Sequence, residues 1–279
     1  MTFKIELLAP IINRYDAFLI DQFGVLIDGE QTYPGAIDAL KHIAQSGKPV
    51  VILSNSGKRA EPNCNRLTSF GFDRQHFVTV VTSGEIAYHS IKNQLGITIK
   101  NDARVMVLAR PGETSPILDL DLTETNNPRM ADILLIVSRD IGMNRKDYIK
   151  LWTEFNATGG KCYCLNPDLN MLTPKGITFS AGTIAKLFEQ RGGDIIWYGK
   201  PYQDIYADAL RFFNNIPRDD ILCIGDSIHQ DIIGGHAAGL ATALVRQGVH
   251  SDISDGKVYN ILSGLGISPT HILRSFSIT

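Results

Sequence analysis

Polar residues able to do chemistry directly follow several apolar runs of this 279-residue chain. Asp21 follows AFLI, Asp226 follows ILCIG and Lys200 follows IIWYG, while Ser54 and Asn55 follow VVIL. Carboxylates, a lysine and a small hydroxyl at one point would repel one another or ionise poorly unless a cation neutralised them. The residue types therefore predict a site that combines a metal ion with an anionic substrate.

Magnesium and phosphate are the partners that suit this set. Mg²⁺ binds through one or two carboxylates while keeping water and phosphate oxygens as its other ligands. Asp226 and Asp231, in GDSIHQD, lie on a segment entering a helix and are predicted to face that ion. Lys200 and the Ser54 hydroxyl would hold phosphate oxygens in the transition state. Asp21 is the candidate nucleophile, because attack on phosphorus forms an aspartyl-phosphate and divides the hydrolysis into two easier steps.

The elements that position these residues alternate between strand and helix. AFLID, GAIDALKHIAQSG and PVVILSN have the pattern of a βαβ unit, and runs that are apolar on both faces are typical of parallel strands covered by helices. In such sheets ligands bind at the carboxyl ends of the strands. We therefore predict an α/β fold with a doubly wound parallel sheet whose strand ends converge on one crevice.

A second alternating set interrupts the first between about residues 97 and 183. A helix capped by Ser83 and running to Gln94 precedes it, and the main set, including DIIWYGKP, resumes after it. This order predicts a core domain of residues 1–83 and 184–279, with an inserted α/β cap domain of residues 84–183.

Composition limits the classes of partner. Charged residues make up 20% of the chain, apolar residues 44%, and the net charge is −2 with a pI near 6.4. This provides no basic surface for nucleic acid or an anionic membrane, so a small molecule is the expected partner. The four cysteines lack zinc-site spacing and are predicted to be reduced, buried thiols. With no signal peptide and no apolar stretch approaching roughly 18 residues, we predict a cytoplasmic protein.

Four motifs in this order resemble those of the haloacid dehalogenase superfamily, class IIA, the group that includes nitrophenyl and nucleotide phosphatases. DQFGVLIDG resembles the first motif, ILSNSGKR the second, GKP the lysine motif and GDSIHQD the acidic fourth. YPGAIDAL and LNPD also resemble segments of the group. The resemblance covers nearly the whole chain, since this group carries its α/β cap between the second and third motifs.

The resemblance implies a role for each matching residue. Asp21 resembles the nucleophile and first Mg²⁺ ligand, and the main-chain carbonyl of Phe23 resembles a further ligand. Asp226 and Asp231 resemble the metal-supporting acids, and Lys200 the charge-neutralising lysine. The residues implied in substrate binding are Ser54, Asn55, Lys200 and, in the cap loop Leu165–Asp168, Asn166 and Asp168. The group commonly pairs through its caps, which implies a homodimer of that kind.

Phe23 departs from the family pattern. The usual residue there is an acid that protonates the leaving oxygen and then activates water, and phenylalanine can do neither. Loss of a positioned acid/base removes on the order of 10²- to 10⁴-fold in rate. Three interpretations follow. The first is a Mg²⁺-dependent phosphohydrolase whose proton carrier is the substrate, water, or another residue such as Asp168 or His229. A separate interpretation of Phe23 is that it packs under the cap as a hydrophobic wall, which would exclude water and favour an apolar substrate.

The other two interpretations do not require a phosphatase. Haloacid dehalogenases also have an aromatic residue two positions after the nucleophile, and halide leaves unprotonated; against this, they do not use Mg²⁺, for which Asp226 and Asp231 are suited. In the third interpretation the protein binds a phosphorylated metabolite or a partner without turnover, since binding alone would also use Asp21, Ser54 and Lys200.

Overall fold

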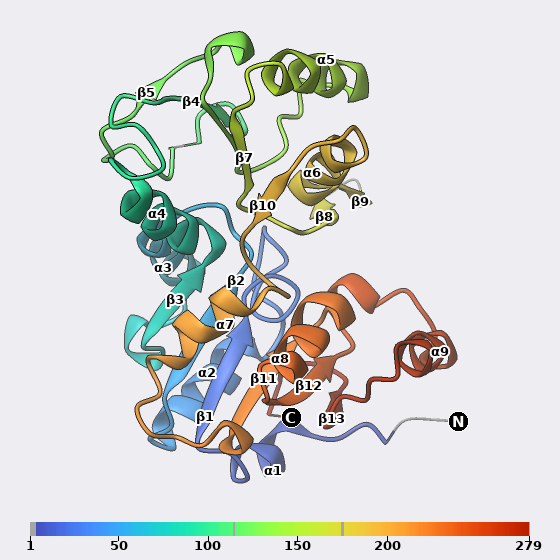
Figure 1. Cartoon of the computed structure of the whole chain (residues 1–279). Coiled ribbons are helices and arrows are strands. Elements are labelled where there is room, and N and C mark those ends of the chain that lie inside the picture. Colours follow the sequence, from blue (N-terminus) through green and yellow to red (C-terminus); the bar gives the residue numbers. More distant parts are fainter. Residues whose placement is uncertain (1–3, 114, 174–175, 279) are drawn as a thin grey trace. The chain divides into compact units, whose positions relative to one another are not determined.

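The structure is a computed structural model that describes residues 4–113, 115–173 and 176–278. The chain forms two compact units. The core unit contains the chain up to Ser54, Glu61–Val81 and the chain from Lys200 onwards. The inserted unit contains Asn55–Ala60 and Thr82–Gly199. Both are built from parallel strands with flanking helices (Figure 1), which confirms the predicted α/β class.

The core unit is organised around a six-stranded sheet in the order β13-β12-β11-β1-β2-β3. The pairs β1–β11, β1–β2, β11–β12 and β12–β13 are parallel. β1 and β2 are buried along their whole length, as expected for strands covered on both faces. The strands are β1 (Ala17–Asp21), β2 (Val50–Ser54), β3 (Thr79–Thr82), β11 (Ile221–Gly225), β12 (Ala241–Val245) and β13 (His271–Leu273).

Helices pack on both faces of this sheet. Phe18 and Ile20 of β1 point to the same side and share one apolar cluster with α2 and α3, while Leu19 alternates to the opposite side. The α-helices of this unit are α1 (Leu8–Ile12), α2 (Ala36–Gln45), α3 (Ala60–Ser69), α7 (Gln203–Leu210), α8 (Ile233–Ala237) and α9 (Asp255–Leu265). Short 3-10 turns are η1 (Arg74–His76), η3 (Arg218–Asp220) and η5 (Gly248–His250), and η4 (Ile228–Ile232) is a π turn.

The inserted unit has its own five-stranded sheet in the order β10-β7-β6-β4-β5, with parallel pairing throughout. An antiparallel hairpin, β8–β9, accompanies it. The strands are β4 (Arg104–Leu108), β5 (Thr123–Glu124), β6 (Ile133–Ile136), β7 (Lys161–Cys164), β8 (Asn170–Thr173), β9 (Gly176–Phe179) and β10 (Ile195–Trp197). The helices are α4 (Ser83–Gln94), η2 (Pro128–Met130), α5 (Arg145–Asn156) and α6 (Ala181–Glu189).

The predicted end of the insertion at residue 183 is wrong. β10 pairs with β7, Trp197 lying opposite Cys164, so residues 184–199 belong to the inserted unit. α6 also packs there, with Ile184 and Phe188 buried in the same cluster as Trp152. DIIWYG is an apolar parallel strand, and its pattern is the same whichever of the two parallel sheets it joins. The local sequence therefore did not distinguish between them.

One predicted helix start shifts by a residue, whereas the prediction for the cysteines is confirmed. The cap of α4 is Thr82 rather than Ser83: the Thr82 hydroxyl accepts a hydrogen bond from the Glu85 amide at 3.0 Å. All four cysteines are free and buried. Among the described residues no helix is both long and apolar enough to cross a bilayer.

Candidate active site

Two acids lie at neighbouring strand ends of the core sheet. Asp21 is the last residue of β1, and Asp226 directly follows β11. These strands are parallel partners, with Ile20 opposite Ile224, so their carboxyl ends meet at one edge. Asp231 comes to the same edge on the π turn η4, five residues after Asp226. The predicted convergence of the three carboxylates is therefore present in the core unit.

The three carboxylates surround a buried lysine. Asp21, Asp226 and Asp231 each offer an oxygen within 4.8 Å of the others. The Lys200 ammonium donates to Asp21 Oδ1 at 2.5 Å and to Asp231 Oδ1 at 2.7 Å. All four side chains are buried. Charge-assisted hydrogen bonds of this kind fix the carboxylates in position.

Lys200 reaches the site by a route other than the predicted one. We expected it at the end of a core strand, but the preceding strand, β10, belongs to the inserted sheet. Lys200 is instead the first residue of the core unit after the insertion. Its contacts with Asp21 and Asp231 are therefore made where the chain re-enters the core.

Glycines shape the position of Asp226. Its Oδ2 accepts a hydrogen bond from the Val249 amide at 2.7 Å. A Cβ at Gly24 or at Gly248 would collide with this carboxylate, and both glycines have positive φ, 91° and 75°. Sequence reasoning missed Gly248 and Val249, because RQGVH lies far along the chain from GDSIHQD and has no local motif. Gly24 was visible within the first motif but had no assigned role.

Asp231 is held by its own turn. Its Oδ2 accepts a hydrogen bond from the Ser227 amide at 3.0 Å, while its Oδ1 faces Lys200. A Cβ at Gly225 would collide with Asp231, which explains a glycine at the end of β11. Thus both carboxylates of GDSIHQD are oriented by backbone amides, with glycine leaving the necessary space.

Burial and neighbouring charges shift the pKa values of the site residues. Burial, opposed by the Lys200 charge, raises the pKa of Asp21 well above its ordinary value. Burial together with the negative charge of Asp231 raises the pKa of Asp226 to about 7. Although burial disfavours the charged lysine, Asp21 and Asp231 raise the pKa of Lys200 above its ordinary range. The charged lysine is therefore stable, whereas the carboxylates are short of positive charge.

A divalent cation suits this deficit. Three carboxylates against one ammonium leave two negative charges uncompensated when all are ionised. Oxygen donors of this type and number are those that hard cations such as Mg²⁺ prefer. The residues present thus fit a divalent metal, with Asp21, Asp226 and Asp231 as the side chains that would hold it.

The remaining predicted residues divide between the two units. Ser54 ends β2 beside β1 and is buried in the core unit. Asn55, Asn166 and Asp168 belong to the inserted unit. There the Asn55 side-chain Nδ2 donates to Asp168 Oδ1 at 2.7 Å, and Asn166 Oδ1 accepts from the Asp168 backbone amide at 3.1 Å. The predicted cap loop is therefore tied to the residue that follows Ser54 in the chain.

The Phe23 side chain packs within the core unit. It lies against the apolar cluster of that unit, and the Arg66 guanidinium sits over its ring at 5.1 Å. Of the two replacements suggested by the sequence, His229 is exposed on η4 of the core unit, and Asp168 belongs to the inserted unit. The Phe23 side chain therefore has a packing role in the core unit.

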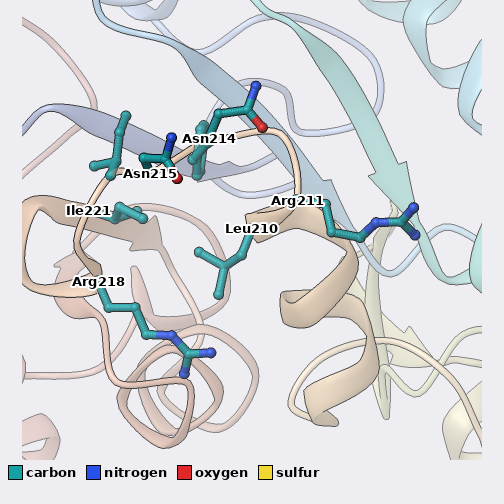
Figure 2. A pocket seen from close by; sticks show the side chains of 8 residues that line it. Leu210, Arg211, Asn214, Asn215, Arg218 and Ile221 are labelled. Carbon is teal, nitrogen blue, oxygen red and sulfur yellow. The ribbon is translucent and has the colours of Figure 1, made fainter.

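The pocket in Figure 2 lies elsewhere on the core unit. Its wall includes Ile221, the first residue of β11, whereas Asp226 follows the last residue of that strand. The pocket is thus at the opposite end of the sheet from the carboxylates. Its two arginines point in different directions in Figure 2; Arg211 pairs with Asp208, and Arg218 donates to a main-chain carbonyl.

Fold and site together define a hydrolase of the haloacid dehalogenase class. Residues 18–123 match the family model described as haloacid dehalogenase-like hydrolase, and residues 197–277 match the model described as HAD-hydrolase-like. The chain belongs to this family, and the resemblance found in the four motifs is confirmed.

The similarity to known proteins extends over nearly the whole chain. Chronophin of Rattus norvegicus is 25% identical over 97% of this chain and 88% of its own length. A dihydroxyacetone phosphatase of Corynebacterium glutamicum is 25% identical over 94% of this chain and 89% of its own.

Solved structures share the fold. A haloacid dehalogenase-like hydrolase of Brucella suis has a TM-score of 0.82 at 24% identity, covering 97% of this chain and 98% of that one. The glycerol phosphate phosphatase of Mycobacterium tuberculosis, solved in complex with calcium, has a TM-score of 0.71 at 22% identity, covering 95% and 75%.

Proposed function

We propose that this protein is a Mg²⁺-dependent phosphohydrolase that acts on a small phosphorylated metabolite through an aspartyl-phosphate on Asp21. The observation that carries the proposal is the buried cluster in which Lys200 joins Asp21 and Asp231 beside Asp226. The phosphatases among its relatives support the substrate class, and the reduced thiols fit a cytoplasmic protein.

In this mechanism Asp21 supplies the attacking oxygen. Lys200 holds the Asp21 carboxylate by a hydrogen bond to Oδ1, which leaves Oδ2 to attack phosphorus. The lysine also offsets negative charge that develops on the phosphoryl oxygens, and the Ser54 hydroxyl is the proposed second contact for them. A bound divalent ion would add further electrostatic stabilisation of that charge. The acyl phosphate on Asp21 is then hydrolysed by water, releasing inorganic phosphate.

Phe23 limits which substrates react well. Without a proton donor at this position, a leaving group that is stable as an anion should depart faster than an alkoxide. We therefore propose slow or specialised turnover, with leaving-group acidity as the main determinant of the first chemical step. Asn55, Asn166 and Asp168 are proposed substrate contacts, and the carbonyl of Phe23 a proposed metal ligand.

Phosphate release from a panel of phosphomonoesters, with and without Mg²⁺, tests the proposal. The panel runs from p-nitrophenyl phosphate to sugar and nucleotide phosphates, with a chloroacid as control. Release that requires Mg²⁺ and is lost in Asp21→Asn supports the proposal. Full activity of the folded Asp21→Asn variant would eliminate Asp21 as the nucleophile, and halide release without metal would indicate a dehalogenase.

Phe23 also favours a second candidate function, binding of a phosphorylated metabolite without turnover. The Phe23 ring is packed under Arg66 and against the core, so the position is built as part of the hydrophobic packing. Phosphate-ester binding that strengthens with Mg²⁺, in the absence of any release across the panel, would support this candidate over the hydrolase.

A further inference from the structure

Two arginines stand at the carboxyl edge of the inserted sheet. β4 ends at Leu108 and β6 at Ile136, and these residues are parallel partners. Arg110 and Arg139 follow the two strands by two and three residues, and the Arg110 amide donates to the Ser138 hydroxyl at 2.9 Å. The carboxyl ends of neighbouring parallel strands are where ligands of α/β sheets bind.

The two guanidinium groups contact opposed residues of the β8–β9 hairpin. Arg110 Nη2 contacts the Met171 sulfur at 3.5 Å, and Arg139 Nη1 donates to Thr178 Oγ1 at 2.6 Å. Met171 and Thr178 are directly opposed in the hairpin, and side chains of directly opposed residues point to the same face. The two cations therefore contact neighbouring side chains on one face.

Neither arginine has an anionic partner among the described residues: no carboxylate lies within 4.0 Å of either guanidinium. Of the acids close to them in the chain, Glu113 accepts a hydrogen bond from the Ser138 hydroxyl at 2.5 Å and pairs with Lys58 at 3.3 Å, and Asp140 Oδ1 accepts one from the Gly142 amide at 2.8 Å. Both arginines are only partly exposed. A partly buried cation with no carboxylate beside it is stabilised when an anion binds to it.

Arg139 is held in a fixed orientation. Its guanidinium lies 3.7 Å from the centre of the Phe179 ring, and Thr178 accepts from one of its nitrogens. Its Nε is buried and has no hydrogen-bond partner among the described residues. A guanidinium whose plane is fixed by stacking on an aromatic ring is suited to bidentate recognition of a carboxylate or phosphate through its terminal nitrogens.

We propose that Arg110 and Arg139 form an anion-binding site on the inserted unit for a small molecule that carries a carboxylate or phosphate group. The site belongs to the inserted unit, whereas the carboxylate cluster belongs to the core unit, and binding at the arginines does not require the proposed hydrolysis. The arginine site is positively charged and the metal-free carboxylate cluster is negatively charged, so the first attracts anions and the second repels them. A ligand with two acidic groups, spaced so that each meets one guanidinium, fits this site best.

Direct titration of the metal-free protein tests the site. Metal removal by chelation, followed by buffer exchange, leaves the core cluster negatively charged. Because that cluster then repels anions, binding of an added anion can be assigned to the arginines. Malonate and inorganic phosphate are titrated in turn, with sodium chloride of equal ionic strength as the reference. We expect saturable shifts of the Arg110 and Arg139 Nε–Hε signals in nitrogen-15 NMR spectra. Shifts no larger than those with sodium chloride, for both anions, would overturn the proposal.

Matched variants locate the binding. Arg110→Gln and Arg139→Gln keep a polar side chain and remove the charge, and each should weaken anion binding roughly 10- to 100-fold in calorimetry. Arg104→Gln is the control, because Arg104 is exposed at the opposite end of β4. If all three variants bound the anion with equal affinity, the assignment of the anion site to Arg110 and Arg139 would be overturned. The wild-type NMR titration decides the matter independently if either test variant fails to fold.

Competition separates two sources of the anionic group. If it is part of the substrate, malonate should raise the KM of a substrate with a second acidic group and leave that of p-nitrophenyl phosphate unchanged. If it belongs to a separate effector, malonate should change the turnover of both substrates alike. Anion binding together with no turnover of any phosphate ester would refute the proposed hydrolysis while supporting this site.

Discussion

Replacing Lys200 by methionine should destabilise the core unit severely, and more so as the pH rises. Lys200 is 2% exposed and donates to both Asp21 and Asp231. Methionine has a similar length but no charge, so the variant leaves buried carboxylates without their cation. Removal of one partner from a buried ion pair costs about 3–5 kcal/mol. We expect a loss of that size in the free energy of unfolding near pH 8 in the absence of metal.

The dependence on pH follows from the carboxylates. The pKa of Asp21 and that of Asp226 are already raised in the folded protein, the latter to about 7, against roughly 4 for an unfolded chain. Loss of the lysine charge raises both pKa values further. At pH values between the unfolded and the folded pKa, the folded variant therefore binds more protons than its unfolded form. Its stability therefore falls as pH rises. Near pH 5 protonation should reduce the loss to roughly half, about 2 kcal/mol.

Urea unfolding of metal-free protein, followed by far-ultraviolet circular dichroism at both pH values, measures this effect. Tryptophan fluorescence is less suitable, since Trp152 and Trp197 both belong to the inserted unit. Lys41→Met is the control, because Lys41 is exposed on α2 and its loss should cost less than about 0.5 kcal/mol. A loss below about 1 kcal/mol for Lys200→Met near pH 8, or one that does not change with pH, would refute the electrostatic account.

Three further predictions concern the same site. Phe23→Asp should raise phosphatase turnover on the order of 10²-fold for esters with poor leaving groups and less for p-nitrophenyl phosphate, and an unchanged rate in the folded variant would show that another group already transfers the proton. The Mg²⁺-induced rise in Tm should increase between about pH 6 and 8, because a proton on Asp226, whose pKa is about 7, competes with the metal; a rise independent of pH would contradict this. Gly248→Ala should lower stability by about 2–4 kcal/mol in urea unfolding through positive φ and collision with Asp226, whereas Gly264→Ala, in open space on α9, should raise it slightly.

The local sequence was sufficient to identify the strand ends of the core. Asp21 and Asp226 each follow a fully apolar run, and in a parallel sheet such runs end at a common edge. Their convergence could therefore be predicted without coordinates. The order of the four motifs added the family, which the comparisons confirmed.

Sheet membership was not predictable in the same way. β10 is an apolar parallel strand like those of the core, yet it pairs with β7 of the inserted sheet. The choice depends on which edge is free when the chain packs, and this is a property of the tertiary structure. The same limit applies to Gly248 and Val249, whose role depends on a contact with Asp226 that joins distant parts of the chain.

Charge balance likewise emerged only from the structure. The sequence shows Arg110 and Arg139 as two arginines 29 positions apart, with acids close to both in sequence. The hairpin register places Met171, which Arg110 contacts, opposite Thr178, which Arg139 contacts, while Glu113 pairs with Lys58. Side-chain pairing of this kind has no periodic signature in the chain.

The most direct test of the central claim is detection of the phosphoryl group on Asp21. The protein is mixed with p-nitrophenyl phosphate and Mg²⁺, quenched in acid during turnover, digested and analysed by mass spectrometry. We expect a phosphorylated peptide that contains Asp21 in the wild type and no such adduct in Asp21→Asn. Mg²⁺-dependent phosphate release that proceeds unchanged in the folded Asp21→Asn variant, with no adduct on the wild-type peptide, would contradict it.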